Sequence, residues 1–95
     1  MSQIINNKEK SRFELFLDPE YAYIDYRYYE EKIALMHTFV PDSHRGQGLA
    51  DQLAKFALEY IETNKIKALV YCPFVTKYIE RHPDYRHLVT MLKKD

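Results

Sequence analysis

The chain has 95 residues, enough for one domain and too few for two, because domains usually contain about 100–150 residues. Its 14 basic and 14 acidic residues cancel, so it lacks the basic excess with which nucleic-acid-binding proteins neutralise phosphates. A single cysteine excludes an internal disulfide, and no apolar run approaches the roughly 20 residues that cross a bilayer. We expect one domain over residues 1–95, a cytoplasmic location, and neither a nucleic-acid nor a membrane partner.

The first forty residues are predicted to form strands. Ile4 and Ile5 precede Asn6-Asn7, a pair that favours a turn. Three further stretches have the alternation or the aromatic content of strands, over residues 12–17, 21–28 and 33–40. Short polar turns separate these three stretches, so we expect an antiparallel meander.

The pattern changes after Pro41. Apolar residues then recur at spacings of three and four, which predicts an amphipathic helix over residues 47–63. The run from Lys67 to Tyr71 predicts a short strand. A strand, a helix and a strand in this order form a crossover unit, so the strand at 67–71 should lie parallel to the strand at 33–40.

A second helix is predicted to begin at Pro73, since proline suits the first turn of a helix, and to end before Pro83. The segment 84–92 is predicted to form a further short helix. Together these elements predict an α/β (α+β) fold. Its sheet is mostly antiparallel with one parallel strand pair, a long crossover helix and a second, shorter helix.

Both glycines of the chain lie in one segment, His-Arg-Gly-Gln-Gly-Leu-Ala-Asp at residues 44–51, where a strand gives way to a helix. Glycine lets the backbone come close to a ligand, and the first turn of a helix offers unpaired N–H groups to phosphate oxygens. Arg45 adds a cation suited to phosphate. The segment lacks the Gly-Lys-Ser/Thr of a P-loop and the third glycine of a dinucleotide fingerprint. It is either an anion site or a tight structural turn.

The run Arg45-Gly46-Gln47-Gly48-Leu49-Ala50 resembles the R/Q-x-x-G-x-G/A signature of the GNAT acetyltransferase superfamily. Residues 71–85 resemble a minimal, single-domain branch of that superfamily, and the whole resemblance covers roughly residues 20–89. It implies that the protein binds acetyl-CoA as a cofactor and moves the acetyl group to an amine on a small molecule or a protein. We expect a monomer or a weak dimer.

The resemblance also implies which residues bind the cofactor. The amides that would bind the coenzyme A pyrophosphate belong to Gln47, Gly48, Leu49, Ala50 and Asp51, with Arg45 and Gly46 beside them. The strand that would pair with the pantetheine arm contributes the backbone of His37, Thr38, Phe39 and Val40. The N–H of Phe39 is the expected donor to the acetyl carbonyl. The chain departs from the superfamily by having tight turns where helices usually build the acceptor site.

Three side chains are candidates for catalysis. Cys72 precedes a helix N-terminus, where thiols become reactive, and it is predicted to accept the acyl group, to protonate the leaving thiolate, or only to fill the core. Tyr78 stands where many GNAT enzymes place a general acid, although it could equally be a core residue. His37 could take a proton from the acceptor ammonium or simply bond a neighbour.

No group of histidines, carboxylates and Cys72 has the spacing of metal ligands, so no metal is expected. Two other functions remain open. The chain could be an acyl-CoA-binding module with little or no catalysis, or a protein-interaction domain whose glycine turn is structural.

Overall fold

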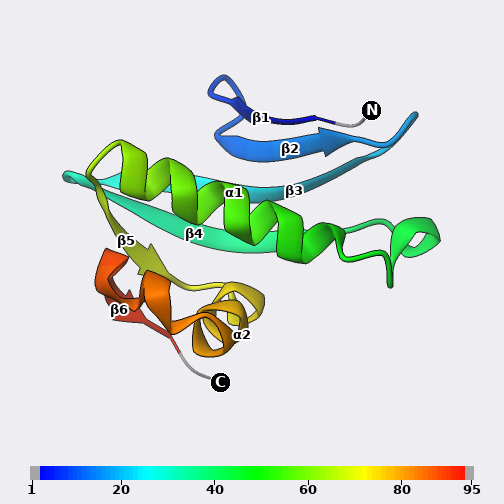
Figure 1. Cartoon of the computed structure of the whole chain (residues 1–95). Helices are drawn as coiled ribbons and strands as arrows, with labels where there is room; N and C mark the ends of the chain where they lie inside the picture. Colours follow the sequence, from blue (N-terminus) through cyan, green and yellow to red (C-terminus); the bar gives the residue numbers. More distant parts are fainter. Residues whose placement is uncertain (1–2, 94–95) are drawn as a thin grey trace.

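The computed structural model describes residues 3–93 and consists of one six-stranded sheet with helices (Figure 1). The elements in chain order are β1 (Ile4–Asn7), β2 (Arg12–Phe16), β3 (Tyr21–Tyr29), β4 (Lys32–Phe39), the 3-10 turn η1 (Asp42–His44), α1 (Leu49–Thr63), β5 (Lys67–Val70), α2 (Pro73–Arg81), the 3-10 segment η2 (Pro83–Leu88) and β6 (Val89–Leu92). The strands lie side by side in sequence order.

The sheet is mixed, as the sequence predicts. Strands β1 to β4 pair antiparallel, which confirms the meander. Strand β5 pairs parallel with β4, which confirms the crossover through α1. Strand β6 pairs parallel with β5, so the sheet has two parallel pairs where only one was predicted.

The turn predicted at Asn6-Asn7 is wrong, because both residues belong to β1. The hydroxyl of Tyr26 donates to Asn6 Oδ1 at 2.6 Å, and Asn7 Nδ2 donates to Glu14 at 2.9 Å. These side-chain bonds hold the asparagines in the sheet, where their turn preference alone would have ended the strand. The chain instead turns between β1 and β2, where Ser11 adopts a positive φ of 54°.

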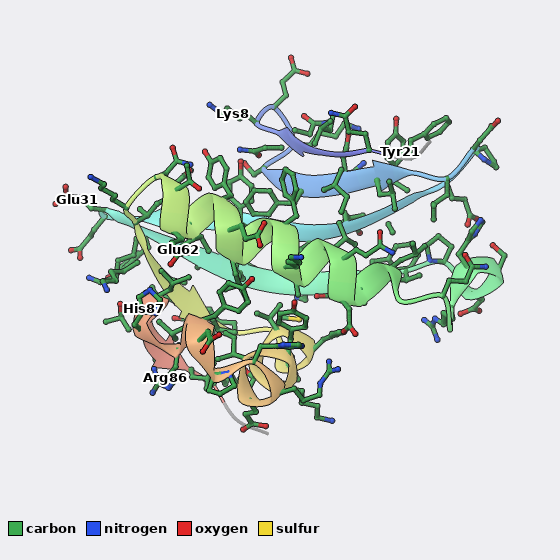
Figure 2. All side chains as sticks on the ribbon, viewed as in Figure 1. Lys8, Tyr21, Glu31, Glu62, Arg86 and His87 are labelled. Carbon is green, nitrogen blue, oxygen red and sulfur yellow. The ribbon has the colours of Figure 1, made fainter. Side chains whose placement is uncertain are left out.

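The helix predicted over 84–92 is correct only through Leu88, where the segment forms the 3-10 helix η2, and is wrong from Val89 onward, where it forms β6. The N–H of Lys93 donates to the carbonyl of Val70 at 2.8 Å, and Thr76 Oγ1 donates to the carbonyl of Lys93 at 2.8 Å. These bonds to β5 and α2 favour an extended chain. Segment η2 also contacts the end of α1, because His87 Nε2 lies 3.3 Å from Glu62 Oε2 (Figure 2).

Both α-helices pack against the same face of the sheet. The core between them includes Phe13, Ile24, Leu35, Val70, Leu53, Leu58, Ile61, Val75 and Ile79. Helix α1 begins at Leu49, two residues later than predicted, because Gly48 takes a left-handed conformation as its N-cap. No helix within residues 3–93 is long and apolar enough to cross a membrane.

The opposite face of the sheet carries polar and aromatic side chains. The ring of Tyr23 lies 5.5 Å from the ring of Phe39, and the guanidinium of Arg12 lies 4.6 Å from the centre of the Tyr23 ring. Phe39 remains largely exposed. We refer to this surface as the open face.

Candidate functional site

Strands β4 and β5 separate before β4 ends. The last bond that joins them runs from the N–H of Tyr71 to the carbonyl of Leu35 at 2.9 Å, whereas β4 continues to Phe39. A β-bulge lies at the same place, because Asp25 pairs with His37 and Tyr26 pairs with Leu35. Bulges bend a strand and redirect its side chains. The second half of β4 therefore has one edge that β5 does not cover.

The glycine turn presents a row of backbone amides. Gly46 and Gly48 have φ values of 83° and 76°, a region that side-chain-bearing residues seldom adopt. No side chain caps α1, and its first backbone bond runs from the N–H of Gln52 to the carbonyl of Gly48 at 3.1 Å. Within the described residues, no hydrogen-bond acceptor is found for the N–H groups of residues 46–51. These amides are free to bind an anion.

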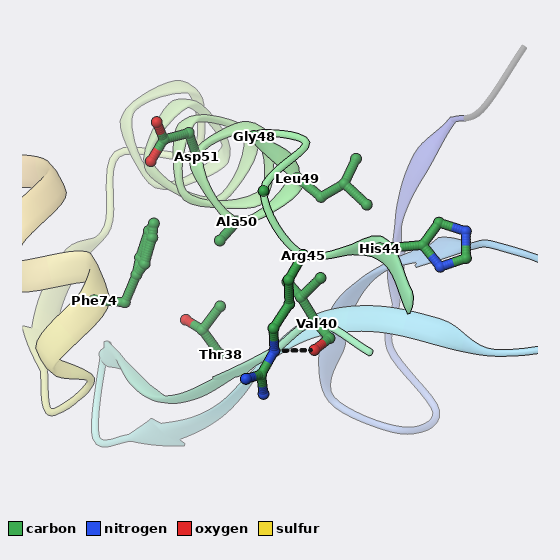
Figure 3. A pocket seen from close by; sticks show the side chains of 10 residues that line it. Thr38, Val40, His44, Arg45, Gly48, Leu49, Ala50, Asp51 and Phe74 are labelled. Atoms are coloured by element: carbon green, nitrogen blue, oxygen red, sulfur yellow. Dashed lines mark hydrogen bonds between the residues drawn. The ribbon is translucent and has the colours of Figure 1, made fainter. Parts of the chain in front are cut away.

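A cavity of about 340 Å³ lies between the glycine turn, β4 and α2 (Figure 3). Its lining residues are Thr38, Val40, His44, Arg45, Gly46, Gly48, Leu49, Ala50, Asp51 and Phe74. Most of the residues predicted to bind the cofactor therefore surround one cavity. His37, Phe39 and Gln47 are not among its lining residues. We refer to this space as the turn cavity.

Sequence reasoning missed two lining residues, His44 and Phe74. Phe74 lies in the first turn of α2, immediately after Pro73, and only its position beside a predicted helix start could have pointed to it. His44 is the first residue of the segment 44–51 and was not among the residues predicted to bind the cofactor. Its Nδ1 lies 2.9 Å from the hydroxyl of Ser43, and it belongs to the turn η1 that leads into the glycine segment.

Arg45 is held at the rim of the turn cavity. Its Nε donates to the carbonyl of Val40 at 3.2 Å, a bond drawn in Figure 3, and lies 3.1 Å from a carboxylate oxygen of Asp42. Both charged side chains are well exposed. The arginine thus joins the end of β4 to the glycine turn, and its charge lies beside Asp42 at the rim of the cavity.

Cys72 is buried behind the turn cavity. It is the N-cap of α2, is 3% exposed and does not line the cavity. Its Sγ lies 3.0 Å from the Oγ1 of Thr38, whose side chain does line the cavity. Thr38 thus joins the buried thiol to the wall of the turn cavity.

Tyr78 lines a different cavity, of about 550 Å³, between α1 and η2. Its ring lies 4.3 Å from the ring of His82. Burial raises the pKa of the Tyr78 hydroxyl, and the negative charges of Asp51 and Glu59 raise this pKa further. The predicted general acid is therefore a protonated phenol, but the structure does not bring it to the turn cavity.

His37 lies on the open face, at the uncovered end of β4. Its side chain is 76% exposed, and its Nδ1 lies 3.3 Å from Asp25 Oδ2. Thr38 lies next to it in the strand and lines the turn cavity, so the two side chains point to opposite faces of the sheet. Within residues 3–93 no three His, Cys, Asp or Glu side chains form a group that could hold a metal ion.

The fold thus places a glycine turn with free amides beside two parallel strands that diverge. Comparison with known proteins identifies the family to which this fold belongs. The family model described as GCN5-related N-acetyl-transferase matches residues 12–88. The chain therefore belongs to the GCN5-related N-acetyltransferase family.

Individual relatives are similar over most of the chain. Protein NATD1 of Gallus gallus is 33% identical over 84 residues, which are 85% of this chain and 76% of that protein. Protein NATD1 of Danio rerio is 28% identical over 95% of this chain and 84% of that protein. The solution structure of a GCN5-like protein from Staphylococcus aureus matches with a TM-score of 0.72 and 26% identity, over 96% of this chain and 90% of that one.

Proposed function

We propose that this protein binds acetyl-CoA in the turn cavity and transfers the acetyl group to an amine. The observation that carries the proposal is the row of amides at residues 46–51, which no protein acceptor satisfies within the described chain. Unpaired amides at a helix N-terminus attract phosphate oxygens because the helix dipole adds about half a positive charge there. Bound acetyl-CoA would supply the acetyl group as an activated thioester.

The lining of the turn cavity supports this proposal. An alanine Cβ built at Gly46 or Gly48 would meet no heavy atom within 4 Å, so the space over both residues is open to a diphosphate. Arg45 lies at the rim as a cation, and Thr38 and Val40 line the part nearest the sheet. The diphosphate would thus lie over the glycine turn and the pantetheine arm along the uncovered edge of β4.

The backbone of β4 supplies a donor to the carbonyl oxygen of the acetyl group. The N–H of His37 is already used, since it donates to Asp25 Oδ1 at 2.8 Å. Successive peptide groups of a strand point to opposite edges, so the N–H of Thr38 points toward the edge that β5 leaves uncovered. We assign the donor to Thr38, in place of the Phe39 amide predicted from the sequence. Removal of one such donor typically costs about 100- to 1,000-fold in rate.

The acceptor amine would approach from the open face, where no helix covers the sheet among the described residues. His37 lies there with an exposed imidazole and could take the proton of an ammonium group. Thr38 lies on the other face and presents a hydroxyl to the turn cavity, where it could donate a hydrogen bond to the departing sulfur. Cys72 would act by holding that hydroxyl.

One observation favours a second function, an acyl-CoA-binding module with little catalysis. Of the three side chains predicted to be catalytic, Cys72 is buried and Tyr78 lines another cavity. Such a module would bind acetyl-CoA without release of free coenzyme A when amines are added.

Two measurements on the purified chain test the proposal. Calorimetric titration with acetyl-CoA should show binding at one site, and its absence would contradict any acyl-CoA function. Free thiol release should then be followed with a lysine-containing peptide and with a polyamine. Amine-dependent release supports transfer, whereas binding without release supports the binding module.

A further inference from the structure

We infer that Asp25 is a positioning residue, which fixes the imidazole of His37 so that its Nε2 faces the acceptor amine as a proton acceptor. The inference rests on the proposed function, because it names the group that prepares the acceptor. Asp25 lies in β3, directly across the sheet from His37 in β4.

Asp25 contacts His37 through both of its carboxylate oxygens. One carboxylate oxygen of Asp25 accepts the backbone N–H of His37 at 2.8 Å, and the other lies 3.3 Å from the ring Nδ1. A carboxylate bound at both oxygens has little freedom to rotate. The β-bulge makes this arrangement possible, because it turns the N–H of His37 toward the side chain of Asp25.

No cation among the described residues forms a competing ion pair with the Asp25 carboxylate. Arg12 pairs with Asp25 across β2 and β3, but its Nε donates to Glu14 at 2.6 Å. Its guanidinium also lies 4.6 Å from the centre of the Tyr23 ring. Among residues 3–93, the only ion-pair partner of Asp25 is His37.

This geometry selects one tautomer of the neutral ring. A carboxylate can only accept, so Nδ1 carries the hydrogen and the lone pair is at Nε2. In the transfer step the ammonium of the acceptor gives one proton to Nε2, which leaves a neutral amine with a free electron pair. The imidazolium so formed is stabilised by the carboxylate of Asp25 and, being exposed, can pass the proton to water.

Asp25 and His37 lie where a proton acceptor for the amine is needed. His37 lies two residues beyond Leu35, the last residue of β4 that bonds to β5. Its neighbour Thr38 lines the turn cavity on the other face. A proton acceptor on the open face therefore lies beside the gap through which an amine would meet the thioester.

The test compares Asp25→Asn with the wild-type chain, with Asp25→Glu, and with Glu31→Gln in an exposed turn as the control. Nitrogen NMR of labelled histidine should show the Nδ1–H tautomer at His37 in the wild-type chain. In Asp25→Asn the amide can keep the backbone bond while its NH₂ group faces Nδ1, so the tautomer should reverse. Because this readout needs no cofactor, it judges the inference even if the chain transfers no acetyl group.

Steady-state kinetics should agree with the tautomer measurement. We expect kcat for the amine to fall about 100-fold in Asp25→Asn, with partial recovery in Asp25→Glu and acetyl-CoA affinity within about twofold of wild type. The control should match the wild-type chain. An Nε2–H tautomer in the wild-type chain, or full transfer by a folded Asp25→Asn variant, would overturn the inference. Failure of acetyl-CoA to bind would instead contradict the proposed function and leave the tautomer result unchanged.

Discussion

The hydroxyl oxygen of Thr38 lies 3.0 Å from the sulfur of Cys72, and this contact joins the wall of the turn cavity to a buried thiol. Thr38 belongs to β4 and Cys72 to the start of α2, two elements that diverge around the cavity. Of these two residues only Thr38 lines the cavity, and Cys72 is buried, so we expect the thiol to influence the reaction without accepting an acyl group. We therefore expect direct transfer rather than a covalent acyl-cysteine.

Substitutions at this contact should separate the role of the Thr38 hydroxyl from that of the Cys72 thiol. Thr38→Val keeps the shape but loses the hydroxyl, so we expect kcat to fall about 10- to 100-fold, with acetyl-CoA affinity nearly unchanged. Cys72→Ser keeps a hydrogen-bond partner for Thr38 and should retain most of the activity. Steady-state kinetics and mass spectrometry provide the measurement. An acetyl group found on Cys72, together with an inactive Cys72→Ser, would contradict direct transfer.

Gly48→Ala should weaken coenzyme A binding. The added Cβ extends into the open space above the turn, and the φ of 76° strains any side-chain-bearing residue. We expect the Kd for coenzyme A to rise about 10-fold or more and the stability to fall by about 1 kcal/mol. Titration with pantetheine, which lacks the diphosphate, is the control. If both ligands lost affinity equally, the glycine turn would not be the diphosphate site.

The sequence predicted the parts of the fold that follow from local patterns. The periodicity from Leu53 to Ile61 located α1, and Pro73 located the first turn of α2. The glycine segment was interpreted as either an anion site or a structural turn, because Gly46 and Gly48 stand where a strand passes into a helix. The structure leaves the amides there without a protein acceptor among the described residues.

What the sequence could not predict depends on contacts between distant residues. Asn6 stays in β1 because Tyr26, 20 residues away, donates to it. Val89 enters the sheet beside Ala68 of β5, an arrangement invisible in its local sequence. Tyr78 was placed by resemblance alone, and the packing of α2 against η2 directs it to another cavity.

The ion pair between Asp51 and Arg81 should tune cofactor affinity. Arg81 lies 3.0 Å from the carboxylate of Asp51, which lines the turn cavity in the first turn of α1. Arg81→Gln leaves that negative charge uncompensated beside a bound diphosphate, so we expect the Kd for coenzyme A to rise about two- to fivefold at low salt. Asp51→Asn should have the opposite effect. The difference between the variants should shrink in high salt, and a salt-independent difference would count against an electrostatic cause.

Folding stability should decline at alkaline pH. Tyr28 is 56% exposed, and the partial burial of its side chain raises its pKa to about 12, from an ordinary value near 10, with a further contribution from Tyr60. Because the folded state holds this proton more tightly, the stabilisation is complete below pH 10 and is lost as the pH rises toward 12.

Denaturant unfolding between pH 9 and 12 measures this loss, and Tyr28→Phe should flatten the decline. Tyr29→Phe, at a more exposed position, is the matched control and should keep the wild-type profile. Identical profiles in wild type and Tyr28→Phe would show that other groups cause the alkaline loss.

The most direct test of the central claim is an amide NMR titration of the full chain with coenzyme A. We expect the largest shifts at residues 46–51, with a second group at Thr38 and Val40 along β4. Pantetheine should shift the β4 group and spare the glycine turn. Saturating coenzyme A that leaves the amides of 46–51 unmoved would contradict the claim that they hold a diphosphate.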